Sequence, residues 1–149
     1  MANDKTAAKA EQLSRRRARA LPVFAVIFIS QQATFFANSG EGERLVDHVH
    51  VGAWLILSIV LLLLIATGGG WIYSREVRDL ANDEVTQAHR LAAFRIGFLA
   101  SMAGCIALYM LSLFEPISGR EAIHLIMTIG LAAALLRFGM LERRALADG

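Results

Sequence analysis

The sequence predicts an all-α integral membrane protein with four helices, and three observations support this fold class. The 149 residues are 56% hydrophobic, which suits a single compact unit. The hydrophobic residues gather in four runs with almost no charged side chain. The basic residues gather on alternate connections between these runs. Together these patterns predict a four-helix bundle in a membrane.

The four apolar runs set the expected spans. Residues 21–39, 49–74 and 96–114 contain no Asp, Glu, Lys or Arg, and residues 122–141 contain only Arg137. Crossing a hydrocarbon core takes roughly 20 apolar residues in helical form. We therefore expect a basic N-terminal segment at 1–20, a cytoplasmic tail at 142–149, and transmembrane helices at about 21–39, 49–73, 94–114 and 122–141.

Two other interpretations of the runs are weaker. A secretory signal would explain the first run, but no small-residue cleavage site precedes its polar exit at Asn38. A soluble bundle would show polar stripes at helical spacing. Residues 54–66, WLILSIVLLLLIA, have no such stripe, which favours lipid-facing helices.

The basic residues predict the topology. Of the 15 Lys and Arg residues, all except Arg44 and Arg120 precede the first run, lie between the second and third, or fall at the end of the chain. The positive-inside rule then predicts a bacterial inner-membrane protein with both termini and the long connector on the cytoplasmic side. These basic residues are divided among juxtamembrane segments and mixed with acids, so we expect no direct nucleic-acid surface.

The first expected span is polar in its outer half. Gln31 and Gln32 lie about 100° apart on a helix, so at least one should face a partner helix. A hydrogen bond to a neighbouring helix is the favoured explanation, and a ligand site or a subunit contact is the alternative. A homodimer would bury this polar side.

Small residues recur in the last two spans. Gly97 and Gly104 in the third, with Gly130 and Ala134 in the fourth, allow close approach of the two backbones. The link at 115–121 is short enough to make these helices an antiparallel hairpin.

Three histidines gather on the expected outer side. His50 and His124 fall at comparable depth in helices of the same direction, so they could hold a b-type haem or a metal ion. The competing explanation makes His48 and His50 interfacial caps and places His124 in a hydrogen bond within the bundle. Proton sensing is a third possibility. The favoured expectation is that no cofactor is bound.

The connector between the second and third spans predicts two helical pieces. Arg75 and Asp79 form an i,i+4 pair in the first piece. Asn82 or Asp83 caps the second piece, which continues without a breaker into the third span and extends it into the cytoplasm. Val85 and Leu91 fall on one face of this extension. The N-terminal segment is expected either as a frayed helix, with Glu11 and Arg15 paired, or as disordered chain to about Gln12.

The connector also resembles part of a known group of proteins. Residues 82–98, NDEVTQAHRLAAFRIGF, carry Asp83, Glu84, Arg90, Ala93 and Gly97 in an order similar to that of small bacterial membrane proteins often encoded beside short helix-turn-helix regulators. The resemblance implies a protein that holds such a regulator at the membrane.

These observations predict a non-enzymatic protein, because no nucleophile and base constellation is present. The expected function is binding and sequestration of a cytoplasmic protein, a small DNA-binding regulator, by the connector. A haem- or ion-handling protein is the alternative, with His50 and His124 as ligands and Gln31 or Gln32 lining the site. The residues expected to bind the partner are Arg75, Arg78, Asp79, Asp83, Glu84, Gln87 and Arg90.

Overall fold

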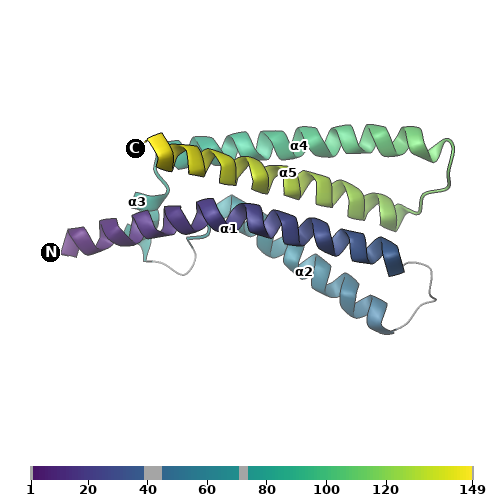
Figure 1. Cartoon of the computed structure of the whole chain (residues 1–149), viewed down its shortest axis with the longest axis horizontal. Helices are drawn as coiled ribbons and strands as arrows, with labels where there is room; N and C mark the ends of the chain where they lie inside the picture. Colours follow the sequence, from purple (N-terminus) through teal and green to yellow (C-terminus); the bar gives the residue numbers. More distant parts are fainter. Residues whose placement is uncertain (1, 39–44, 71–73, 149) are drawn as a thin grey trace.

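The computed structural model describes residues 2–38, 45–70 and 74–148, and this part of the chain is all-helical. The described elements are α1 (Ala2–Asn38), α2 (Leu45–Thr67), α3 (Arg75–Ala81), α4 (Glu84–Ser112) and α5 (Gly119–Asp148). The long helices run along one axis, and the short α3 lies at the same end as both termini (Figure 1). We call this the α3 end, and the other the hairpin end. The all-α prediction is confirmed.

Two of the helices are long and apolar enough to cross a membrane. They are α4 and α5, and residues Val51–Thr67 of α2 form a shorter apolar helix. The expected first span ends at residue 39 and the expected second span ends with residues 71–73, and these residues lie outside the described part of the chain. By length and composition, α4 and α5 therefore match two of the four predicted spans.

Helix α1 is continuous from Ala2 to Asn38, although it contains Pro22. Its first half packs against α3, where Ala10 and Leu13 of α1 meet Val77 and Ala81 of α3 in a small buried cluster. The helical expectation for the N-terminal segment is therefore confirmed. The expected pair is also formed, with Arg15 Nη2 lying 2.7 Å from Glu11 Oε1.

Helix α5 holds the bundle together, because α1, α2 and α4 all pack against it. The main core lies around α5 and includes Leu135 and Phe138, with Leu21 and Phe28 from α1 and Leu61 from α2. Helix α2 diverges from the other helices toward the hairpin end (Figure 1).

The α4–α5 contact depends on small residues, as the sequence predicted. A Cβ added at Gly97 would lie 2.8 Å from the carbonyl oxygen of Gly130 and 2.9 Å from Cβ of Ala134. Large side chains on α4 point outward instead: Leu91 is 73% exposed and Val85 is 53% exposed. The face shared by these two residues is thus not the packing face, because only small side chains allow the two backbones to approach.

The helix starts follow local capping chemistry. Asp83 is the N-cap of α4, and its Oδ1 accepts a hydrogen bond from the backbone N–H of Thr86 at 2.8 Å. A capping box opens α5: Ser118 Oγ accepts from Glu121 N, and Ser118 N donates to Glu121 Oε2. These hydrogen bonds fix the boundaries of the α3–α4 connector and of the α4–α5 hairpin.

Candidate functional site

Three arginine side chains at the α3 end each donate a hydrogen bond to a backbone carbonyl of another helix. We call them the arginine layer. The hydrogen bonds are from Arg17 Nη2 to Ala81 O at 2.6 Å, from Arg90 Nε to Ile65 O at 3.0 Å, and from Arg143 Nε to Ala18 O at 2.8 Å.

Each of these carbonyls lacks a donor within its own helix. Ala81 ends α3 and Ile65 lies in the last turn of α2, where carbonyls have no N–H four residues ahead. Ala18 is inside α1, but the residue four positions later is Pro22, which has no N–H. The arginine layer therefore pairs carbonyls that chain geometry leaves open, and it joins the helices by doing so.

A buried ion pair lies within the layer. Arg17 and Glu142 are each 4% exposed, and Arg17 Nε lies 3.9 Å from Glu142 Oε2. Burial lowers the pKa of Arg17, and the charge of Glu142 opposes this effect. The other oxygen of Glu142, Oε1, lies 3.0 Å from Nδ1 of His89. One carboxylate thus connects α1, α4 and α5.

Sequence reasoning did not single out Glu142, His89 or Pro22. Glu142 is the lone acid in the sequence LERR at the end of the last apolar run, which is a weak signal of a buried partner for an arginine. Pro22 stands four residues after Ala18, and that spacing marks an unpaired carbonyl within a helix. Nothing local indicates His89, because its partner is 53 residues away.

The structure divides the residues predicted to bind a partner into two groups. Arg75 and Asp79 are exposed and form the expected i,i+4 pair, with 3.9 Å between Arg75 Nε and Asp79 Oδ2. Glu84 is also exposed. The side chain of Arg78 lies outside the described residues. Among the described residues, the side chains of Arg75, Asp79 and Glu84 form no hydrogen bond or ion pair with another helix.

The second group has structural roles. Asp83 caps α4, Gln87 Nε2 donates to the carbonyl of Asn82 at 3.1 Å, and Arg90 belongs to the arginine layer. Asn82 in turn donates to the carbonyl of Thr67 at 3.3 Å, so it helps to close the end of α2. Changes in this group would disturb the fold of the connector as well as its surface.

Comparison with family models, curated proteins and solved structures finds no match. The site must therefore be interpreted from its own chemistry. Within the described residues, no three His, Cys, Asp or Glu side chains come close enough to hold a metal ion.

A second polar cluster lies in the half of the bundle toward the hairpin end. Thr128 Oγ1 donates to Oε1 of Gln32 at 3.0 Å, and the exposed fractions of these two side chains are 5% and 6%. Gln32 thus faces a partner helix, as expected, whereas Gln31 is exposed. This hydrogen bond ties α1 to α5.

His124 lies one turn before Thr128 on α5 and is 4% exposed. Its ring stacks on Trp54, with 3.8 Å between ring centroids and 23° between ring planes. Trp54 also stacks on Phe28, so the three rings connect α1, α2 and α5. The side chain of His50 lies outside the described residues, and the His50–His124 ligand pair remains a prediction.

Replacing Thr128 by valine is expected to lower the free energy of unfolding by about 0.6–2 kcal/mol, because the side-chain volume is kept while the bond to Gln32 is lost. Thermal unfolding in detergent micelles measures the effect. Thr67→Val is the matched control, since among the described residues the Thr67 hydroxyl bonds only to the carbonyl of Leu63 in its own helix. Equal effects of the two substitutions would contradict a role for the Gln32–Thr128 bond.

Proposed function

We propose that this protein is a non-enzymatic, four-span protein of a bacterial inner membrane that binds a cytoplasmic protein at its α3 end. In this arrangement both termini and the connector lie in the cytoplasm, and a small helix-turn-helix regulator is the proposed partner. Binding would sequester the regulator from DNA.

The distribution of apolar surface supports the membrane placement. In the most apolar stretch of α4, only 17% of the residues are buried by the rest of the protein. In the corresponding stretch of α5, 44% are buried. The exposed side chains of α4 include Phe98, Ile106 and Tyr109, each more than 60% exposed. Water disfavours an apolar surface of this extent on a soluble protein, whereas hydrocarbon accepts it.

The charge distribution supports the orientation. Arg143 and Arg144 lie near the end of α5 at the α3 end, where the basic stretch of α1 also lies. Arg120 is the basic residue of the described part at the hairpin end. By the positive-inside rule, the α3 end faces the cytoplasm.

The observation that carries partner binding is the packing of α3 on α1. Val77 and Ala81 are buried against α1, so the connector forms an ordered surface instead of a solvated link. Leu80 is 53% exposed between the exposed charges of Asp79 and Glu84. Aliphatic and charged side chains on one fixed surface suit a protein partner.

Charge reversal at Asp79 and Glu84 is expected to reduce partner capture about tenfold or more, since like charges then replace complementary ones. These two residues are chosen because they are exposed, whereas Asp83 caps α4. The measurement is co-purification of the protein encoded by the neighbouring reading frame from detergent-solubilised membranes.

Glu115→Lys is the matched control, because Glu115 is an exposed acid at the hairpin end. This variant should capture the partner as well as the wild type does. Partner binding at the α3 end would be refuted by unchanged co-purification with the doubly reversed variant, or by no capture with the wild type.

A further inference from the structure

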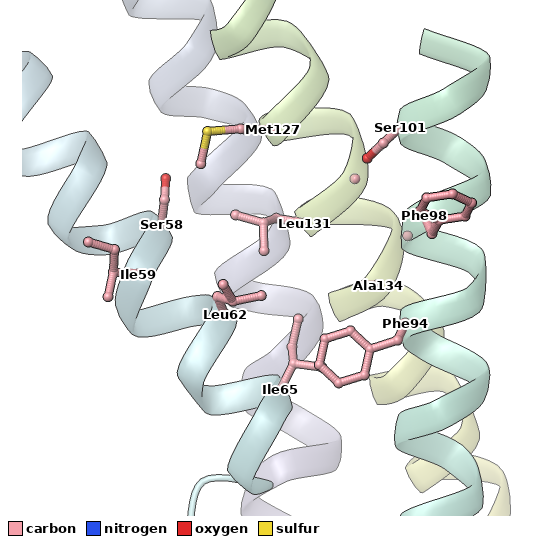
Figure 2. A pocket seen from close by; sticks show the side chains of 12 residues that line it. Ser58, Ile59, Leu62, Ile65, Phe94, Phe98, Ser101, Met127, Leu131 and Ala134 are labelled. Atoms are coloured by element: carbon pink, nitrogen blue, oxygen red, sulfur yellow. The ribbon is translucent and has the colours of Figure 1, made fainter. Parts of the chain in front are cut away.

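An apolar groove lies between α2 and α4, with α5 as its floor. Its volume is about 310 Å³. Figure 2 shows Leu62 and Ile65 of α2 on the side that faces Phe94 of α4, and Ile59 and Phe98 also line the groove. Leu131 projects between the walls from α5. The groove exists because α2 and α4 each pack on α5.

The groove suits an apolar occupant. Its wall residues remain accessible, with Ile59 57% and Phe98 63% exposed. Two hydroxyls line it, from Ser58 and Ser101, and that of Ser58 donates to the carbonyl of Trp54 in its own helix. A polar ligand would therefore find few groups to replace its hydration, whereas a hydrocarbon chain has no polar group to dehydrate on entering.

A basic side chain stands at the α3 end of the groove. Arg90 lies one turn before Phe94 on α4, and its Nε donates to the carbonyl of Ile65 across the groove. This hydrogen bond places the Arg90 guanidinium beside Ile65, which lines the α2 wall of the groove. Among the described residues, its two terminal nitrogens form no hydrogen bond or ion pair, in contrast to Arg17, which faces Glu142.

Among the described residues, no carboxylate forms an ion pair with Arg90, and Glu142 is engaged by Arg17 and His89. The planar guanidinium presents paired N–H donors that match phosphate oxygens. Basic pockets between helices on the cytoplasmic side of a membrane are suited to anionic headgroups.

We propose that the groove holds an acyl chain of an anionic phospholipid whose phosphate is bound by Arg90. The inference rests on the proposed membrane placement and is independent of partner capture. The lipid would fill the space between α2 and α4 and so hold α2 against the bundle.

The test uses the full chain purified in a mild non-ionic detergent and then exposed to phosphatidylglycerol. Native mass spectrometry measures the retained lipid. The wild type is expected to retain it, and Arg90→Gln to bind it about ten- to hundredfold more weakly, because a charge-assisted pair is lost. Arg144→Gln, an exposed arginine elsewhere at the same end, is the control and should retain it.

Leu62→Trp tests the groove independently of the charge. Leu62 is 48% exposed on the α2 wall, so a larger side chain there fills the groove without entering the core. This variant should also lose the lipid.

If Arg90→Gln fails to fold, Arg90→Lys keeps the charge but lacks the paired donors, and it should bind more weakly than the wild type.

Any one of several results would overturn the proposal. They are no lipid retained by the wild type, equal retention by Arg90→Gln or Leu62→Trp, equal retention of phosphatidylcholine, or displacement of the lipid by inorganic phosphate, which would indicate a free-anion site. A second copy of the chain occupying the groove would appear in the same spectra as a dimer that Leu62→Trp removes, and this result would also overturn the proposal. A chain that stays dissolved without detergent would instead refute the membrane placement.

Discussion

Replacing Glu142 by alanine is expected to lower the free energy of unfolding by about 3–5 kcal/mol, because it leaves Arg17 as an uncompensated buried charge. The substitution also removes the acceptor of His89. Unfolding in mixed micelles of a mild detergent and dodecyl sulfate, followed by circular dichroism, measures the change.

Two controls separate the charge from other effects. Glu115→Ala removes an exposed carboxylate and should change stability by less than about 0.5 kcal/mol. The double variant with Arg17→Met and Glu142→Leu removes both charges and keeps apolar volume, so it should recover the cost of the unpaired charge and retain only that of the lost Arg17–Ala81 hydrogen bond, about 1–3 kcal/mol. A double variant as unstable as Glu142→Ala would show that the unpaired charge is not the main cause.

Replacing Gly97 by alanine is expected to lower the free energy of unfolding by about 1–3 kcal/mol through overpacking. The added Cβ would lie 2.8 Å from a backbone oxygen of Gly130, which has no flexible end to move aside. The helices α4 and α5 would have to separate along their contact. The same unfolding measurement applies.

Gly52→Ala is the matched control, because a Cβ at Gly52 meets nothing within 4 Å. Alanine is also the better helix former, so this variant should be neutral or slightly more stable. If both variants behave alike, the close α4–α5 approach does not contribute to stability.

Local chemistry explains which parts of the fold were predictable. Asp83 as the N-cap of α4 needs only its own side chain and the N–H of Thr86, three residues later. The α4–α5 pairing followed from Gly97 and Gly130, since small residues at helical spacing mark close helix contacts. Such signals can be found in the sequence because the residues are close together in the chain or because small residues recur at helical spacing.

The arginine layer was not predictable in the same way. Arg143 bonds to Ala18, 125 residues away, and Arg17 bonds to Ala81, 64 residues away. The sequence shows a cluster of basic residues, which positive-inside topology and lipid headgroups explain equally well. Only the three-dimensional arrangement identifies which arginine pairs with a carbonyl and which stays exposed.

The histidines show the same limitation. The ring of His124 stacks on Trp54 of another helix, a neighbour that the sequence did not indicate. His89 attracted no prediction and contacts the buried Glu142. Residue type indicates the chemistry available to a side chain, whereas its partner depends on packing between distant segments.

Cysteine accessibility in intact cells tests the membrane placement most directly. Cys105 is the single cysteine, so Cys105→Ala supplies a background in which Asp79→Cys and Glu115→Cys are introduced separately. Both sites are exposed, one at each end of the bundle. A membrane-impermeant maleimide should label Glu115→Cys in intact cells and Asp79→Cys only after lysis. Labelling of Asp79→Cys in intact cells would contradict the cytoplasmic position of the α3 end and, with it, the proposed partner site.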